Sequence, residues 1–263
     1  MQNWKITLAY DGTPYHGWQI QPGLSTVQGE LQTALDRVLG ESPLPQGSGR
    51  TDTGVHALAQ VASFPLRAPI PAANLTRALN RTLPAAIRIL AAEPVAEDFH
   101  ARHSTTAKTY EYRIFRGNQC SPFLARYVHP CRWPLDISLL DLAAQTVLGE
   151  HDFRSFAASD PEVAARGFED SLTSQEPRST TRTIFSSNWT EEPGDLLVYR
   201  VRGNGFLHHM VRNLVGTMLE IARGQFPPDA MGRILDARSR SVAGPTAPAS
   251  GLFLHSVEYP SDK

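Results

Sequence analysis

The order of strand-like and helix-like segments is the feature that most limits how this chain can fold. Alternating apolar and polar residues predict a strand over residues 4–10, and an apolar stripe predicts a helix that begins at a capping box, residues 25–28, and ends at Gly40. Two further strands, a helix opened by Pro71 and a strand over residues 87–91 follow. This β-α-β-β-α-β order predicts a ferredoxin-like unit.

The second half of the chain repeats this order. Strands are predicted over residues 108–115, 181–189, 196–202 and 252–259, with helices over 136–149, 207–223 and 231–238. We therefore predict an α+β fold of two tandem ferredoxin-like (RRM-like) units, 1–104 and 105–263, whose sheets lie side by side and leave a central cleft. Residues 157–181, rich in Ser, Thr, Glu, Asp and Gly, predict a mobile surface insertion.

Charge and cysteine content narrow the classes of partner. The formal net charge of −1 lacks the basic excess typical of nucleic-acid binding, yet only Lys5, Lys108 and Lys263 are lysines and all other basic residues are arginines. Arginine suits bidentate phosphate contacts, although genomic base composition can produce the same bias. Two cysteines without zinc or disulfide spacing, no signal sequence and no membrane-length apolar run predict a cytoplasmic protein without a membrane partner.

The stretch from Gly49 to Ala57, GRTDTGVHA, is the strongest candidate for a functional site. Glycine tolerates backbone conformations and close approaches that a Cβ forbids, so Gly49 and Gly54 allow a tight turn that presents Arg50 and Asp52 to a ligand. An alternative remains open at this point, because an aspartate in such a turn often serves only as an Asx-turn or a helix cap.

Two other segments carry candidate site residues. Lys108, Tyr110 and Tyr112 share one face of a predicted strand, where tyrosines are either half-buried core residues or rings that stack on a base. In the helix over 207–223, Arg212 lies off the apolar stripe, one turn before Gly216, which lets another element pack closely. Arg212 is either solvated or, if it points into the cleft, paired with the carboxylate of Asp52.

Metal and nucleotide sites are not expected. Gly54 and the strand-like run after it make a helix between Asp52 and His56 improbable, and the pair His208–His209 with Arg212 follows no known ligand pattern. No Walker A loop or GxGxxG sequence is present. We therefore predict no metal and no small-molecule cofactor.

Five blocks of the chain resemble the tRNA pseudouridine synthase A family. They run in the family's order between residues 5 and 259, which makes the match more specific than any single motif. The blocks are residues 10–19 with 26–28, residues 49–57, residues 99–102 with 108–112, residues 206–216, and residues 247–254.

The resemblance implies an isomerase, an intramolecular transferase that converts uridine to pseudouridine in the anticodon stem-loop of tRNA, at positions 38, 39 and 40. The reaction breaks the N1–C1′ bond, turns the retained uracil and joins C5 to C1′, with no need for a cofactor. The family also implies a homodimer in which one tRNA reaches across both subunits. A basic patch built from two chains explains how a near-neutral monomer binds RNA.

The resemblance further implies a role for each candidate site residue. Asp52 is the catalytic carboxylate, ionised at neutral pH, acting as a nucleophile at C1′ or C6 or as a base at the sugar. Because a base inside a stem must be flipped out, Arg50 occupies the space it vacates. Tyr110 holds the detached base near C5, Arg212 forms a salt bridge with Asp52, and Leu252 lines an apolar pocket that excludes water.

Two competing classes of protein remain at this point. A non-catalytic RNA-binding protein could stack bases on its sheets, but the chain lacks the aromatic run of such modules, and Asp52 would repel phosphate. A metal-dependent nuclease would use Asp52, His208 and His209, and its activity would stop with a chelator. Neither class explains all five blocks.

Overall fold

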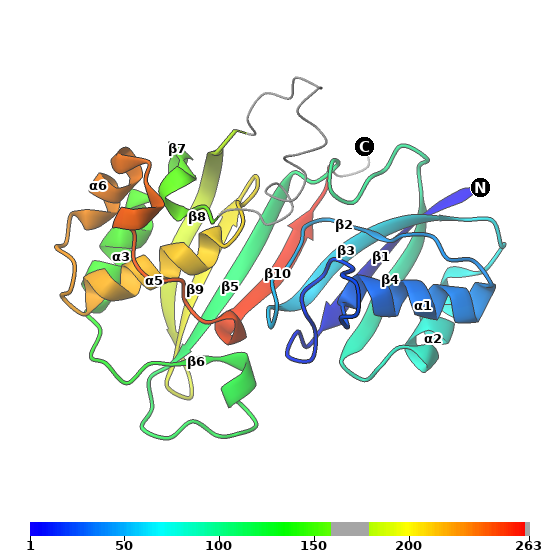
Figure 1. Cartoon of the computed structure of the whole chain (residues 1–263), viewed down its shortest axis with the longest axis horizontal. Helices are drawn as coiled ribbons and strands as arrows, with labels where there is room; N and C mark the ends of the chain where they lie inside the picture. Colours follow the sequence, from blue (N-terminus) through cyan, green and yellow to red (C-terminus); the bar gives the residue numbers. More distant parts are fainter. Residues whose placement is uncertain (159–178, 261–263) are drawn as a thin grey trace. The chain divides into compact units, whose positions relative to one another are not determined.

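The computed structural model describes residues 1–158 and 179–260 (Figure 1). Five α-helices and ten strands in these residues confirm the mixed α+β class. Most of the insertion predicted over 157–181 lies outside the described residues. The described residues divide into two compact units. Unit 1 comprises residues 1–114, 119–130 and 249–260, and unit 2 comprises residues 115–118 and the described part of 131–248.

The sheet of unit 1 is built around its first strand. β1 (Gln2–Tyr10) lies antiparallel to both β3 (His56–Leu66) and β4 (Ile87–Val95), and the short β2 (Gln46–Gly47) lies antiparallel to β3. Residues 4, 6, 8 and 10 of β1 are buried, as the alternating pattern predicts. The sheet order in unit 1 is therefore β4-β1-β3, with β2 attached to β3.

A strand from the far end of the sequence completes unit 1. β10 (Leu252–Glu258) lies between β3 and β5 (Ala107–Phe115), parallel to β3 and antiparallel to β5 (Figure 1). Phe253 pairs with His56 of β3. Directly opposite residues share a face of a sheet, so one face of the β10–β5 pair carries four apolar side chains. These are Tyr110, Tyr112, Leu252 and Leu254.

The start of α1 (Val27–Leu39) differs from the predicted capping box. Thr26, not Ser25, is the N-cap, and its hydroxyl accepts a hydrogen bond from the Gly29 N–H at 3.3 Å. The side chain of Gln28 is buried, where it accepts from the N–H of Ile20 at 3.0 Å and donates to the carbonyl of Pro45 at 2.8 Å. The prediction was wrong because the side chain of Gln28 forms hydrogen bonds with the loops before and after α1 rather than with the N-cap of the helix.

Unit 2 contains an antiparallel run of strands covered by helices. The strands follow the order β7-β8-β9. Their bounds are β7 (Gly149–Asp152), β8 (Thr181–Glu192) and β9 (Leu196–Gly203). The remaining elements are α2 (Ala72–Thr82) and β6 (His129–Pro130) in unit 1, and α3 (Ile137–Thr146), α5 (Met210–Ala222) and α6 (Ala230–Ala237) in unit 2.

The helix α5 begins three residues later than the sequence predicts. His209 has a φ of 59°, in the left-handed region, so the residues from Leu207 to His209 precede the helix instead of forming its first turn. The expected close packing at Gly216 is confirmed, because an added Cβ there would fall on the carbonyl oxygen of Pro245. Among the described residues, no helix has the length and apolar character needed to cross a membrane.

Candidate active site

A tight turn in unit 1 presents Asp52. Asp52 lies in the loop that joins β2 to β3, where its side chain is half-buried, and Arg50 lies exposed two residues earlier. The Val55 N–H donates to the carbonyl of Asp52 at 3.1 Å, and Gly54 has a φ of 77°. The predicted turn is thus confirmed, and Gly54 provides the left-handed conformation that it needs.

The loop after β1 holds the backbone of this turn. The Trp18 N–H donates to the carbonyl of Thr51 at 3.0 Å, and the Gly54 N–H donates to the carbonyl of Tyr15 at 3.4 Å. Gly17 has a φ of 84°, and an added Cβ there would lie 2.5 Å from the Thr51 carbonyl oxygen. Residues on both sides of Asp52 are therefore fixed by one neighbouring loop.

Buried polar side chains fix the entry to the turn. The hydroxyls of Tyr10 and Thr51 lie 2.8 Å apart, the amide of Gln60 donates to the carbonyl of Gly49 at 2.9 Å, and Ser48 donates to the Gln60 side-chain oxygen at 2.6 Å. Sequence reasoning missed Ser48 and Gln60 among these residues. The available signal was Gln60, a polar side chain within an otherwise largely apolar strand, because a buried amide needs partners.

The ammonium of Lys108 in β5 lies close to Gly49. The Lys108 ammonium donates to the carbonyl of Ser48 at 2.5 Å, and a Cβ on Gly49 would lie 3.1 Å from the same nitrogen. Gly49 is absent from the glycines with positive φ. Gly49 is therefore not needed for a left-handed conformation, whereas Gly54 is.

Tyr110 lies in the electrostatic field of Asp52. Its side chain is buried, with 8 % of its surface exposed, and it shares a face of β5 with Lys108. Burial raises the pKa of the Tyr110 phenol well above its ordinary value, and the charges of Tyr10 and Asp52 raise it further. The ring next to the carboxylate is therefore a neutral phenol at physiological pH.

Leu252 and Arg212, the other predicted site residues, lie in different units. Leu252 in unit 1 is buried and pairs with Tyr112 across β10 and β5. Arg212 in unit 2 is half-buried on α5, where its Nε donates to the carbonyl of Ala247 at 2.7 Å and the Ala247 N–H donates to the Arg212 carbonyl at 3.1 Å. The structure thus groups Arg50, Asp52, Tyr110 and Leu252 in one unit, and the salt bridge between Asp52 and Arg212 stays a prediction.

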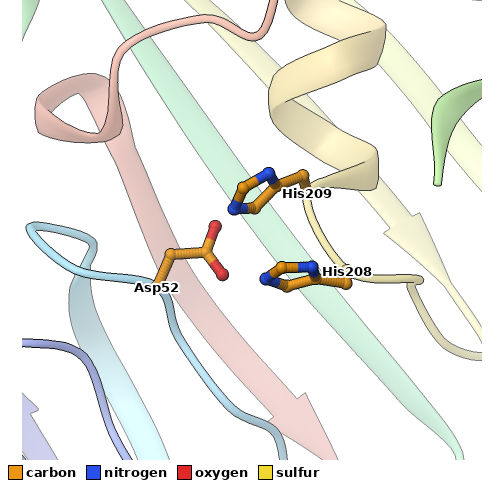
Figure 2. A group of neighbouring side chains, drawn as sticks. All are labelled: Asp52, His208 and His209. Carbon is orange, nitrogen blue, oxygen red and sulfur yellow. The ribbon is translucent and has the colours of Figure 1, made fainter. Parts of the chain in front are cut away.

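Figure 2 shows the three residues of the nuclease alternative. Asp52 projects from the turn before β3, and His208 and His209 project from the segment that leads into α5. The two imidazole rings are 4.0 Å apart between centroids. Since Asp52 belongs to unit 1 and both histidines to unit 2, the group carries no conclusion about a metal ion.

The phenol of Tyr10 makes stability depend on alkaline pH. Burial raises the pKa of Tyr10 to about 12, although hydrogen bonds with Thr51 and Gln60 lower it in part. Because the folded state disfavours the phenolate, this contribution to the free energy of unfolding is intact below pH 10 and is lost as the pH rises from about 10 through about 12. Urea unfolding at pH 9 to 12 should therefore show a smaller alkaline decrease for Tyr10→Phe than for the wild type. Equal decreases in the free energy of unfolding of the two proteins would contradict this role of Tyr10.

Known proteins of one family are similar to this chain along almost its whole length. A family model described as tRNA pseudouridine synthase matches residues 6–104 and 143–260. A protein of Solibacter usitatus is 53% identical over 98% of this chain and 100% of its own length. One of Moorella thermoacetica is 47% identical over 97% and 98%, and one of Limosilactobacillus fermentum is 42% identical over 99% and 97%. All three are named tRNA pseudouridine synthase A.

Proposed function

This chain belongs to the tRNA pseudouridine synthase A family, and we propose that it isomerises uridine at positions 38, 39 and 40, in the anticodon stem-loop of tRNAs, through the carboxylate of Asp52. It is an isomerase that forms pseudouridine in tRNA. The observation that carries the site assignment is the turn that fixes Asp52 beside the neutral phenol of Tyr110 in unit 1. A carboxylate held on a rigid backbone needs little reorganisation to reach its reacting atom.

The chemistry divides between a charged and an apolar part of the site. Asp52 supplies the charge, as a nucleophile at C1′ or C6 of the uridine or as a base at the sugar. Tyr110 offers a neutral aromatic face to the detached uracil, near C5, because its raised pKa keeps it protonated. Leu252, on the same face of the strand pair as Tyr112, lines the pocket and keeps water from the intermediate.

The reaction itself provides the test of this function. Joining C5 to C1′ expels the proton on C5, so tRNA labelled with tritium at uracil C5 should release tritium to water. We expect release in the presence of a chelator, with the RNA intact. Bound but unaltered tRNA would favour a non-catalytic RNA-binding protein, and fragments that disappear with the chelator would favour a nuclease.

Arg50 is proposed to fill the stem after the target base has been flipped. Its side chain is exposed and stands two residues before Asp52 on the same fixed turn. Flipping a paired base costs a few kcal/mol, so a residue that replaces the base acts on the rate rather than on initial binding. Arg50→Ala should lower turnover about 10- to 100-fold and change the Kd for tRNA only a few-fold.

Two controls sharpen this prediction. Arg81→Ala removes the same charge from an exposed position of α2 and should leave turnover unchanged. An anticodon-arm RNA whose target uridine is unpaired should be affected by Arg50→Ala much less than one whose target is paired. Equal losses on both RNAs, or equal losses in Kd and turnover, would contradict a role in flipping.

The Arg212 proposal rests on how α5 holds this side chain. The bond from its Nε to Ala247 fixes one edge of the guanidinium, and a fixed guanidinium is suited to pair with a carboxylate. We assign Arg212 as the partner that keeps Asp52 ionised and oriented.

The larger architecture is also part of the proposal. The order β4-β1-β3 with β2 on β3, all antiparallel, supports a ferredoxin-like first unit, and we propose a second such unit beside it with a central cleft. The proposed domains are residues 1–104 and 105–263. We further propose a cytoplasmic homodimer that binds one tRNA across both subunits, since the net charge of one chain is only −1.

A further inference from the structure

A buried histidine behind the catalytic turn has no role in the function proposed so far. His56 opens β3, four residues after Asp52, and only 1 % of its surface is exposed. Its ring stacks on Phe253 of β10 at 4.7 Å between centroids. Phe253 lies on the face of β10 opposite to Leu252, so His56 does not share the face that carries Tyr110.

The partners of the two ring nitrogens define its protonation state. Nε2 lies 3.0 Å from the carbonyl oxygen of Arg126, which can only accept, so Nε2 carries a hydrogen. Nδ1 lies 3.1 Å from the Gly12 nitrogen, whose N–H donates to it. A bond from the Gly12 N–H to Nδ1 fits the neutral imidazole with its proton on Nε2.

Asp11 offers Nδ1 a competing partner. One oxygen of Asp11 lies 3.2 Å from Nδ1, and its other oxygen accepts from the Tyr127 hydroxyl at 3.0 Å. A proton on Nδ1 would make that nitrogen a donor to Asp11 and would end its bond with the Gly12 N–H. The protonation state of Nδ1 therefore determines whether it bonds to the Gly12 N–H or to Asp11.

Gly12 connects this choice to the catalytic turn. An added Cβ on Gly12 would fall on the carbonyl oxygen of Val55, so the two backbones are in direct contact. The N–H of Val55 in turn closes the turn on the carbonyl of Asp52. We propose that neutral His56 is a positioning residue for Asp52, which holds the loop around Gly12 against the turn and releases it when the ring is protonated. This inference rests on the proposed function.

The groups around the ring set the direction of the pH effect. Burial lowers the pKa of His56, while Asp11 and hydrogen bonds to the backbone of Arg126 and Ser250 raise it in part. The guanidinium of Arg113, which lies 4.1 Å above the Phe253 ring, lowers it again. Arg126 and Tyr127 border the ring from the segment before β6. Since the net shift is downward, the ring is neutral at pH 7, and turnover should fall only in acid, as protonation breaks the Gly12 bond.

A matched pair of substitutions tests the proposal. His56→Gln keeps an acceptor for the Gly12 N–H and a donor for the Arg126 carbonyl but cannot titrate. We expect its turnover at pH 7.5 to stay within about three-fold of the wild type and to decline less between pH 7 and 5. His56→Leu lacks both bonds and should lose roughly 100-fold in turnover at every pH, with little change in KM for tRNA.

Controls separate this inference from the function on which it rests. Tritium release by the wild type is measured first. If the wild type releases no tritium, the proposed function is refuted, whereas the proposed hydrogen bonds of His56 are not. His151→Gln, the same change in unit 2, should keep the wild-type acid decline. A decline in His56→Gln as steep as in the wild type, or full activity of His56→Leu, would overturn the proposal.

Histidine nitrogen NMR of the wild type gives a readout that does not depend on activity or on variants that fold. It should show the tautomer protonated at Nε2 for His56 at pH 7 and protonation of Nδ1 in acid, assigned by the signal missing from His56→Gln. A ring protonated at Nδ1 at pH 7 would likewise overturn the proposal.

Discussion

Asp52→Asn is expected to release no measurable tritium from tRNA labelled at uracil C5, a fall in turnover of at least about 10⁴-fold. The amide has the size of the carboxylate but neither its charge nor its nucleophilicity. The turn around residue 52 is held by backbone bonds from Val55, Trp18 and Gly54, none of which involves the side chain of Asp52. The fold and the Kd for tRNA should therefore stay close to those of the wild type.

A matched control makes this result specific. Asp36→Asn makes the same change on an exposed position of α1 and should keep full activity. Turnover by Asp52→Asn at the wild-type rate would refute the assignment of Asp52. Loss of tRNA binding together with turnover would instead show that the carboxylate supports the fold of the site.

Gly216→Ala should destabilise the protein by about 3 kcal/mol, while Gly232→Ala should stabilise it by about 0.5–1 kcal/mol. Both glycines lie inside helices, where alanine is the better helix former. At Gly216 the new Cβ would fall on the carbonyl oxygen of Pro245, and no side-chain rotation can relieve a contact with backbone. At Gly232 the nearest atom is the Thr146 methyl at 3.8 Å, an ordinary contact.

The comparison also reports on the proposed site, because the segment displaced by Gly216→Ala includes Ala247, to which Arg212 is bonded. At a temperature where both variants remain folded, turnover should fall for Gly216→Ala and stay unchanged for Gly232→Ala. Urea unfolding gives the two free-energy changes, and tritium release gives the two rates. Changes of the same sign in stability would contradict the packing of this segment against α5.

The sequence pattern correctly predicted the elements that depend only on residues close together in the sequence. The alternation of β1 and the glycine-flanked turn at Asp52 follow from residues next to each other in sequence. The start of α5 could not be predicted, because the left-handed conformation of His209 interrupts a run that is otherwise suited to a helix. The strand β7 was missed for a different reason, since four mostly polar residues have no alternating pattern.

The supports of the candidate site depend on partners far apart in the sequence. Gly49 attracts attention as a flexible residue, and the structure shows that it lies close to the ammonium of Lys108, which is 59 residues later in the sequence. The bond between Gly12 and His56 joins two motifs that the sequence presents separately. Such pairings become visible only when the sheet brings β1, β3 and β5 into one unit.

The position of β10 has a consequence for how the protein is made. This strand lies directly beside the first residues of β3, but about 190 residues separate the two in sequence. At a synthesis rate of roughly 5–20 residues per second, a ribosome completes the Asp52 turn about 10–40 s before it supplies the neighbouring strand. Until then the first residues of β3, which directly follow the Asp52 turn, lack the strand that pairs with them in the finished protein.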